Sequence, residues 1–449
     1  MSLSFLQRGN VTHVLRLKPL VLAVAGATGV SALVAASAWR RSRLLILCYH
    51  GVSLGDEHEA LPELYLPPTL FRRRLELLRA RDCSVLPLGE ALARLREGTL
   101  PPRAVALTFD DGTQDFAARA VPLLREFDVP ATVYVSTYYC GRGQPIFDTA
   151  LRYVLWRGRR SGADLGDLAG RRTLPVASDA DVQPVWDALY GHAHANAMSA
   201  DAKDALLRRV AGRVGVDYDA FLETGMFQVM TPGHIRELPR DLVSVELHTH
   251  RHRLPSARAE FAREIADNRA HLLPLGVHRA RHFCYPNGEY RADAAAWLHD
   301  LGVESATTCV PGIVSRATDP MLLPRFVDTC EVADATFDAW VSGVGGLLPR
   351  RRAYRLDTDR LRGAAAGPGA AAPAASRHGL GLPAQEVHQH ELSERHRARE
   401  VRLPAGDLAH ALHKFDERAV AREHERVDDD PGPAAVGDLA QGLAEDARV

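Results

Sequence analysis

The stretch Leu107-Thr108-Phe109-Asp110-Asp111-Gly112 decides the fold predicted for this chain. The apolar run over residues 104–107 predicts a short buried strand, and an amphipathic pattern over 113–127 predicts a helix after the glycine turn. Two adjacent carboxylates therefore stand where a strand ends and a helix begins, which is where α/β folds place their chemistry. Because neighbouring side chains on an extended backbone point to different sides, Asp110 and Asp111 can serve as a base and as a metal ligand. The alternative interpretation is a solvated Asp-Asp-Gly turn.

Histidines follow a second strand-like run further along the chain. Residues 243–247 form this run, and His248, His250 and His252 come directly after it. Imidazole is the commonest nitrogen ligand for zinc-like metals, and two histidines with the Asp111 carboxylate leave positions open for water and substrate. The pair is either His248 and His252, with the backbone turning back, or His248 and His250 on one face of a continued strand. A solvated histidine-rich loop is the alternative to a metal site.

These two segments give the chain a resemblance to a known family. Thr108-Phe109-Asp110-Asp111-Gly112, followed by His248-Thr249-x-x-His252, resembles the motifs of polysaccharide deacetylases with the NodB homology domain. Four further segments are similar to motifs of that family or of its poly-N-acetylglucosamine deacetylase branch: Leu47-Cys48-Tyr49-His50-Gly51-Val52, Phe283-Cys284-Tyr285-Pro286-Asn287-Gly288, Ala306-Thr307-Thr308 and Leu323-Pro324-Arg325. The resemblance covers roughly residues 44–330.

The resemblance implies a metal site and a division of roles among its residues. Asp111, His248 and His252 would hold a divalent cation, with Zn2+ as the first candidate and Co2+, Ni2+ or Mn2+ as alternatives. Asp110 would act as the general base, and His50 of the N-terminal motif would act as the general acid.

The third motif implies an oxyanion and substrate site, and it also contains a departure from the family pattern. The backbone N–H of Tyr285 would stabilise the oxyanion, with Pro286 beside it in the substrate site. Many members carry an arginine after the motif's phenylalanine, where this chain has Cys284. In the family that arginine orients the catalytic aspartate, and Arg325 is the candidate to orient Asp110 here.

Strand and helix patterns alternate from residue 44 to about residue 330. This alternation predicts a parallel sheet closed or nearly closed into a barrel, and the family resemblance implies a distorted (β/α) barrel with about seven strands. We therefore predict an α/β deacetylase domain over residues 44–345. Residues 141–225 interrupt it with helical periodicity and no strand-like run, which predicts a helical insertion, either a substrate lid or a structural addition.

The two ends of the chain differ from this domain. Residues 19–39 lack charged side chains and are flanked by basic residues, so they are expected to form an uncleaved membrane anchor within the N-terminal segment 1–43. A cleaved signal peptide ending near Ala36-Ser37-Ala38 and an Ala-rich soluble helix are the alternatives. Membrane association facing the periplasm or cell exterior follows from the anchor, with a cytoplasmic location as the alternative. Residues 346–449 begin with an Ala/Gly/Pro-rich stretch and predict a disordered tail.

The composition limits the function further. The net charge of −1 gives no basic field for nucleic acid, and six scattered cysteines without a Cys-x-x-Cys pair suggest neither disulfides nor a cysteine zinc site. Motifs and resemblance together predict a metal-dependent hydrolase that removes N-acetyl groups from the amino sugars of an N-acetylated glycan. A metal-dependent amidohydrolase on a small-molecule amide and a non-catalytic glycan-binding protein of polysaccharide assembly are the alternatives. A binding protein needs no base beside a metal, which argues against the last.

Overall fold

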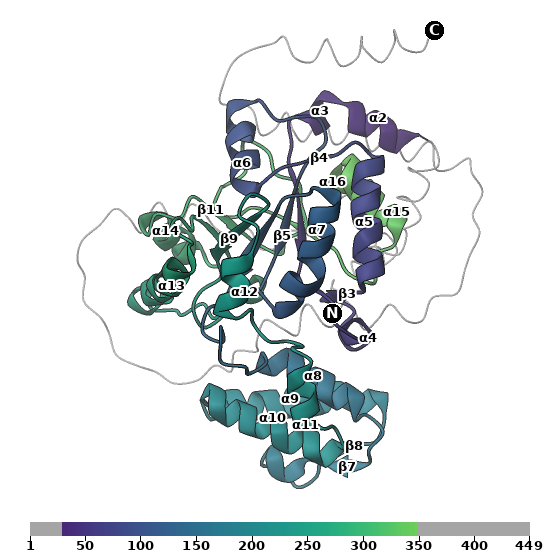
Figure 1. Ribbon diagram of the computed structural model, residues 1–449, viewed down its shortest axis with the longest axis vertical. Coiled ribbons are helices and arrows are strands. Elements are labelled where there is room, and N and C mark those ends of the chain that lie inside the picture. Colours follow the sequence, from purple (N-terminus) through teal and green to yellow (C-terminus); the bar gives the residue numbers. More distant parts are fainter. Residues whose placement is uncertain (1–28, 348–449) are drawn as a thin grey trace, which may run out of the picture. The chain divides into compact units, whose positions relative to one another are not determined.

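The computed structural model describes residues 29–347, and its centre is a curled parallel sheet (Figure 1). Seven strands follow one another in the order β11-β10-β9-β6-β5-β1-β12, and β4 pairs with β5 outside that path. The strands are β1 (Leu45–Tyr49), β4 (Ser84–Val85), β5 (Ala104–Phe109), β6 (Ala131–Val135), β9 (Val243–Leu247), β10 (His282–Cys284), β11 (Ser305–Thr307) and β12 (Phe326–Val327). The sheet is a parallel half-barrel, which confirms the predicted α/β fold with about seven parallel strands.

The central strands are buried along their whole length. Every residue of β1, β5 and β6 is buried, so these strands appear in the sequence as continuous apolar runs and not as alternating patterns. This is the pattern of parallel strands that are covered on both faces. Strand β5 pairs with β1 on one side and with β6 on the other, which places the end of β5 in the middle of the sheet.

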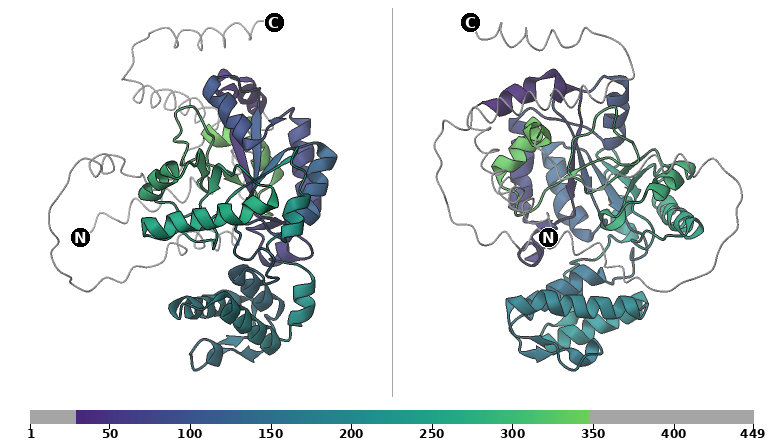
Figure 2. Two further views of the ribbon diagram at one scale, coloured as in Figure 1. Left: turned by 60° about the vertical axis from the view of Figure 1, so that its left-hand side comes forward. Right: turned by 180° about the vertical axis from the view of Figure 1, so that it is seen from behind.

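Helices surround the outside of the sheet (Figures 1 and 2). They are α4 (Glu57–Ala60), α5 (Pro68–Ala80), α6 (Leu88–Glu97), α7 (Val121–Phe127), α12 (Pro232–Glu237), α13 (Arg258–Leu272), α14 (Ala292–Asp300), α15 (Asp334–Ser342) and α16 (Val344–Leu347). In α5, the apolar stripe of Phe71, Leu75 and Leu78 is buried. The helix expected after Gly112 forms as a π-helical turn, η1 (Phe116–Ala120), that continues into α7.

A helical subdomain is inserted between β6 and β9. It comprises α8 (Phe147–Arg157), α9 (Val182–Ala195), α10 (Ala200–Val214) and α11 (Tyr218–Glu223), shown in teal at the bottom of Figure 1. The insertion packs around its own apolar cluster, which includes Leu151, Leu189 and Leu207. It also contains an antiparallel pair, β7 (Ala163–Asp164) with β8 (Pro175–Val176), where no strand was expected. Strands of two residues are too short to give a periodic sequence signal.

The N-terminal part of the described chain packs against the domain. Helices α2 (Val30–Ala36) and α3 (Ala38–Arg41) are separated at Ser37, and α2 contacts α15. The buried guanidinium of Arg40 donates to the carbonyl oxygens of Arg43 (2.8 Å), Ala104 (3.2 Å) and Val341 (3.2 Å). Within residues 29–347, no helix combines the length and the apolar character needed to cross a membrane. The predicted span 19–39 lies partly outside the described residues, as does the predicted tail from residue 348 onward.

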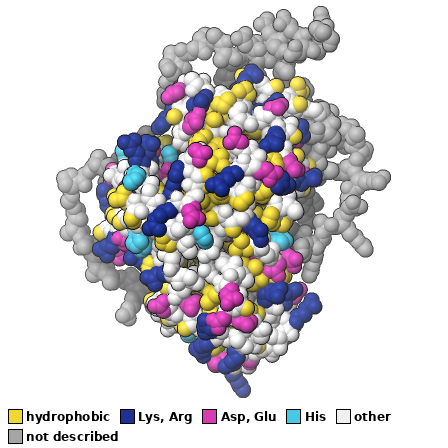
Figure 3. All heavy atoms as spheres, viewed as in Figure 1, with side chains coloured by type: hydrophobic (Ala, Val, Ile, Leu, Met, Phe, Trp, Pro, Cys, Tyr) yellow, Lys and Arg dark blue, Asp and Glu magenta, His cyan; other side chains and the backbone are white. Residues whose placement is uncertain are grey.

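Charged side chains of both signs are interspersed on the face shown in Figure 3. This distribution agrees with the net charge of −1 of the whole chain.

The remaining short strands, β2 (Gly51–Val52) and β3 (Tyr65–Leu66), form a separate parallel pair next to the end of β1.

Candidate active site

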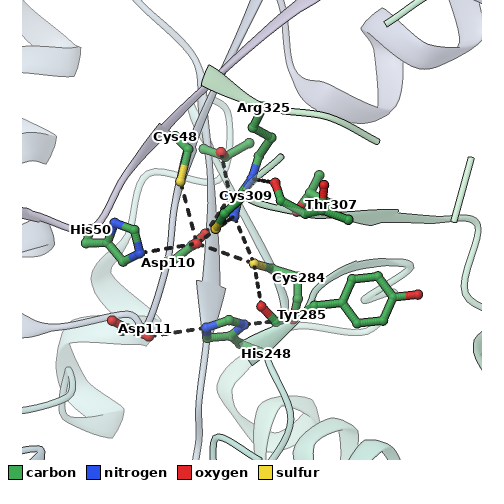
Figure 4. Close-up of polar contacts among 12 residues, drawn as sticks. Cys48, His50, Asp110, Asp111, His248, Cys284, Tyr285, Thr307, Cys309 and Arg325 are labelled. Carbon is green, nitrogen blue, oxygen red and sulfur yellow. Dashed lines mark hydrogen bonds and ion pairs between the residues drawn. The ribbon is translucent and has the colours of Figure 1, made fainter. Parts of the chain in front are cut away.

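Polar side chains from several strands meet at the carboxyl edge of the sheet (Figure 4). His50 follows β1, Asp110 and Asp111 follow β5, and His248 follows β9. Because the strands run parallel, their carboxyl ends share one edge, and α/β proteins place catalytic groups there. The parallel topology therefore brings together four side chains that lie far apart in the sequence.

Asp111, His248 and His252 form a compact cluster. Oδ1 of Asp111 lies 3.2 Å from Nε2 of His248 and 3.1 Å from Nε2 of His252. The three ligand atoms lie within 4.8 Å of one another. The His248 side chain is almost fully buried, whereas the side chains of Asp111 and His252 are 21% and 24% exposed. The cluster is thus anchored in the interior and open to solvent on one side.

The backbone is strained at this cluster. Asp111, Thr249 and His252 have φ angles of 68°, 61° and 51°, in the left-handed region that non-glycine residues rarely adopt. Such conformations persist only where the surrounding structure imposes them, and they gather at functional sites. At His252 the turn brings the second imidazole back toward Asp111.

The donor set of this cluster fits a divalent cation. Metal–ligand bonds of about 2.0–2.2 Å in tetrahedral geometry separate nitrogen and oxygen donors by roughly 3.3 Å, close to the distances observed here. The ring of His248 is held by a hydrogen bond of 2.8 Å from Nδ1 to the carbonyl oxygen of Cys284, which leaves Nε2 as the lone-pair donor. Burial raises the pKa of Asp111, but while Nε2 of His248 and of His252 carry protons, their hydrogen bonds hold that pKa well below its ordinary value; a cation would take the place of those protons.

His250 lies outside this cluster. Its Nδ1 is 2.9 Å from Oγ1 of Thr137, and its ring packs against the rings of Tyr138 and His271. Of the two pairings left open by the sequence, the structure therefore brings His248 and His252 together with Asp111.

Asp110 forms a buried, two-pronged ion pair with Arg325. Nη1 and Nη2 of Arg325 each lie 2.7 Å from one carboxylate oxygen of Asp110. Arg325 is fixed in turn by hydrogen bonds to Oγ1 of Thr108 (3.1 Å) and to the carbonyl oxygen of Thr308 (2.9 Å). Burial would raise the pKa of Asp110, but the charge and hydrogen bonds of Arg325 outweigh it and hold this pKa well below its ordinary value. Arg325 is thus placed to orient Asp110, although the third motif has Cys284 where many family members have an arginine.

His50 lies beside the same carboxylate. Its Nε2 is 3.8 Å from Oδ2 of Asp110, and its side chain is 20% exposed. The other ring nitrogen, Nδ1, is buried and has no hydrogen-bond partner among the described residues. His50 is therefore positioned between the Asp110 carboxylate and solvent.

The backbone N–H of Tyr285, which the resemblance implies as an oxyanion donor, is engaged within the sheet. The N–H of Tyr285 donates to the carbonyl oxygen of Thr307 at 3.2 Å, because the pairing of β10 with β11 continues to this residue. Its hydroxyl donates to the carbonyl oxygen of Met321 at 3.1 Å. Pro286, which was predicted beside it, is buried at the start of the short turn Pro286–Gly288.

Three thiols, which the sequence did not suggest, surround Asp110. The Sγ atoms of Cys48 and Cys284 lie 3.6 Å and 3.4 Å from Oδ2 of Asp110, and Sγ of Cys309 lies 3.6 Å from Nη2 of Arg325. A hydrogen bond from Cys48 lowers the pKa of Cys309 to about 6, although burial opposes this shift. The cysteines are scattered in sequence, and the signal that identifies them is that each lies at or just beyond the end of a strand.

The fold and the site together define a class. A parallel half-barrel carries a cluster of two histidines and one carboxylate beside an arginine-paired aspartate, an arrangement typical of metal-assisted hydrolysis. Residues 97–166, which contain Asp110 and Asp111, match the family model described as polysaccharide deacetylase. Over this segment the chain is therefore similar to the polysaccharide deacetylase (NodB) family, with distant similarity to poly-N-acetylglucosamine deacetylases.

The similarity to individual proteins is limited in extent. The poly-beta-1,6-N-acetyl-D-glucosamine N-deacetylase of Staphylococcus epidermidis is 32% identical over 71 residues, which are 16% of this chain and 25% of that protein. The matched segment thus spans about a quarter of the curated relatives. Among solved structures, the deacetylase PplD of Streptococcus pyogenes in complex with acetate is 19% identical, with 66% of this chain and 96% of that chain covered and a TM-score of 0.43. IcaB from Ammonifex degensii is 18% identical, with 67% and 97% covered and a TM-score of 0.43.

Proposed function

We propose that this protein hydrolyses the N-acetyl groups of amino sugars in an N-acetylated polysaccharide. The observation that carries the proposal is the arrangement of two adjacent carboxylates with separate partners. Asp111 is grouped with His248 and His252, whereas Asp110 is paired with Arg325. The family match supports glycan N-deacetylation as the reaction class. A relative over the matched segment is named as an N-deacetylase of poly-beta-1,6-N-acetyl-D-glucosamine, which supports the choice of substrate.

An amide is a poor electrophile with a poor leaving group, so its hydrolysis requires help at both ends of the bond that breaks. A divalent cation held by Asp111, His248 and His252 would supply Lewis acidity, which polarises the acetyl carbonyl and makes a water molecule more acidic. Zn2+ is the first candidate because two imidazoles and one carboxylate suit it, and Co2+, Ni2+ or Mn2+ are alternatives.

Asp110 accepts the proton of the attacking water. The two hydrogen bonds from Arg325 fix both of its oxygens, so the carboxylate is already oriented before the reaction begins. The same pairing keeps the carboxylate ionised although it is buried, and only the ionised form can act as a base. Arg325 is therefore a positioning residue that acts through Asp110.

His50 donates a proton to the departing nitrogen. Its ring is partly exposed on the open side of Asp110, where a substrate can reach it. The C–O bond to water forms, the C–N bond of the acetamide breaks, and the proton from His50 completes the amine. The products are acetate and a free amino sugar, and the proton taken by Asp110 balances the one that His50 gives up.

The test is acetate release from β-1,6-linked N-acetylglucosamine oligomers by the full chain, with bound metal measured on the same sample. We expect acetate release that depends on the metal. In Asp110→Asn, release should be abolished while the metal content stays unchanged, because Asp110 is not a ligand. In His248→Ala, metal and activity should be lost together.

Two other outcomes would reject the proposal. Stoichiometric metal without acetate release from any N-acetylated glycan would favour a small-molecule amide as substrate. Glycan binding with neither metal nor acetate release would favour a non-catalytic binding protein. Loss of metal from Asp110→Asn would contradict the separate roles assigned to the two aspartates.

A further inference from the structure

A second group of metal-ligand side chains lies next to the proposed cation cluster and shares none of its residues. It consists of Cys48 at the end of β1, Cys309 just after β11 and Asp110, whose ligand atoms all lie within 4.8 Å of one another. His50 adds a fourth donor, since its Nε2 is 3.8 Å from Oδ2 of Asp110. Figure 4 shows these side chains arranged around the Asp110 carboxylate.

The spacing within this group matches a tetrahedral cation site. Bonds of about 2.3 Å to sulfur and about 2.0–2.2 Å to oxygen place a sulfur and an oxygen ligand roughly 3.5 Å apart. The observed separation between Sγ of Cys48 and Oδ2 of Asp110 is 3.6 Å. Two sulfurs, one oxygen and one imidazole nitrogen form a soft donor set, which favours thiophilic cations over Mg2+ or Ca2+.

The charge of the surroundings also suits a divalent cation. When two thiolates and the carboxylate bind a divalent cation, the formal charge of the group is −1, and the adjacent guanidinium of Arg325 neutralises it. Nη2 of Arg325 already contacts the sulfurs of Cys284 (3.2 Å) and Cys309 (3.6 Å), and these contacts also suit thiolate sulfur. Arg325 therefore does not need to move for the site to fill.

The group can be reached from solvent. Cys48 and Asp110 are buried, but Cys309 is only partly buried and the side chain of His50 is 20% exposed. A cation can therefore enter from the open side of the site, past His50 and Cys309.

We propose that Cys48, Cys309, Asp110 and His50 form a second, inhibitory site for a thiophilic divalent cation such as Zn2+ or Cd2+. On binding, each thiol releases its proton to solvent and its sulfur forms a bond to the cation. The cation occupies the lone pairs of Asp110 and His50, which the proposed hydrolysis uses as base and acid. The inhibitory effect rests on the proposed function, whereas the binding site itself does not.

Cobalt provides a direct test of the binding site. The metal-free full chain is titrated with Co2+ under a non-coordinating reductant, and thiolate-to-cobalt charge-transfer absorption is recorded in the near ultraviolet. We expect the wild type to take up two equivalents, with this absorption developing alongside one of them. Cys309→Ser should lose most of the absorption and one equivalent, and the variant with both Cys48→Ser and Cys309→Ser should lose it entirely.

Cys83→Ser is the matched control, because Cys83 lies directly before β4 and takes no part in the group. This variant should still bind two equivalents of Co2+ and show the charge-transfer absorption. A single equivalent in the wild type, or undiminished absorption in the double variant, would overturn the proposal. If the double variant is misfolded by circular dichroism, Cys309→Ser decides alone, since Cys309 is only partly buried.

The activity arm separates this inference from the proposed function. In wild type, acetate release should rise with the first equivalent of Zn2+ and fall when the second binds, whereas Cys309→Ser should show the rise without the fall. An equal fall in both proteins would overturn the inhibitory role. If no acetate is released at any Zn2+ level, the deacetylase proposal fails, and the cobalt spectrum still decides whether the second site exists.

Discussion

Two carboxylates are buried in the same parallel sheet, at the end of β5 and near the end of β9, and they are held in different ways. Asp110 faces the guanidinium of Arg325 across two hydrogen bonds. Glu246 forms no ion pair with any described residue, although the charge of Arg281 acts on it, and it accepts hydrogen bonds from the backbone N–H groups of Arg281 (2.6 Å) and His282 (2.8 Å). Both carboxylates are therefore buried, but Asp110 is paired with a guanidinium and Glu246 with backbone N–H groups.

The partner reverses the effect of burial on ionisation. Burial raises the pKa of Glu246 to about 7, and the two backbone donors offset this shift only in part. At Asp110, the charge and hydrogen bonds of Arg325 overcome the same burial penalty and hold the pKa well below its ordinary value. Burial of a carboxylate alone thus does not indicate an active site in this sheet. A buried carboxylate that is kept ionised, beside the cluster of Asp111, His248 and His252, does indicate one.

The largest effect is expected from breaking the Asp110–Arg325 pair. Arg325→Met leaves the carboxylate of Asp110 buried without its cation, which should lower the free energy of unfolding by about 3–5 kcal/mol. Denaturant unfolding measures this loss, and acetate release should fall with it. Because the penalty comes from an uncompensated charge, combining Arg325→Met with Asp110→Asn should restore part of the stability but none of the activity. If the two losses simply add in the double variant, the pair does not interact as described.

The sequence was sufficient for the framework of the fold because the central strands are continuous apolar runs. The apolar run over residues 104–107 predicts β5 and the strand-like run over residues 243–247 predicts β9, and the carboxylates and histidines directly after them are the predicted site residues. Strand β12 (Phe326–Val327) could not be predicted from the sequence, because two residues carry no periodicity. Its place in the sheet depends on pairing with β1.

The site was predictable where it follows single strand ends, and not where it depends on contacts between strands. The sequence offered Arg325 as a candidate partner of Asp110, but only the pairing of β12 with β1, and of β1 with β5, brings the two together. The same applies to Cys48, which lies in β1, and Cys309, which follows β11. The hydrogen bond from the N–H of Tyr285 to the neighbouring strand β11 is likewise a contact between strands, which the sequence alone does not show.

Glu246 offers the next largest test, through pH. The folded protein keeps the proton on Glu246 up to a pKa of about 7, whereas the ordinary value is 4.5, so between these limits the folded state binds more protons than the unfolded state. The free energy of unfolding should therefore fall as the pH rises through this window, by about 3 kcal/mol at most. Glu246→Gln should remove this part of the decline, as measured by denaturant unfolding at several pH values.

The matched control for that measurement is Glu260→Gln, because Glu260 is exposed on α13. The difference in unfolding free energy between Glu246→Gln and wild type should grow with pH, while the difference for Glu260→Gln should stay constant. A pH-independent difference for Glu246→Gln would show that Glu246 is ionised in the folded protein throughout this range, as Asp110 is.

Metal removal tests the cluster of Asp111, His248 and His252. A cation bound only by the folded protein should stabilise it by about 2.7 kcal/mol when present at one hundred times its dissociation constant. Chelation should lower the unfolding midpoint and abolish acetate release, and added Zn2+ should restore both. His250→Ala should respond to chelation as wild type does, because His250 lies outside the cluster, whereas His252→Ala should show almost no response.

The smallest effect is expected at Thr108, which supports Arg325 without sharing its charge pair. Its hydroxyl accepts a hydrogen bond from Nη1 of Arg325 and donates one to the carbonyl oxygen of Leu47 at 2.8 Å. Thr108→Val removes both hydrogen bonds at nearly constant volume and should cost about 1–2 kcal/mol of unfolding free energy. Thr108→Ser keeps the hydroxyl and should show a smaller drop in acetate release than Thr108→Val. If Thr108→Ser reduces turnover more than Thr108→Val does, packing of the methyl group, and not the hydrogen bond to Arg325, orients the pair.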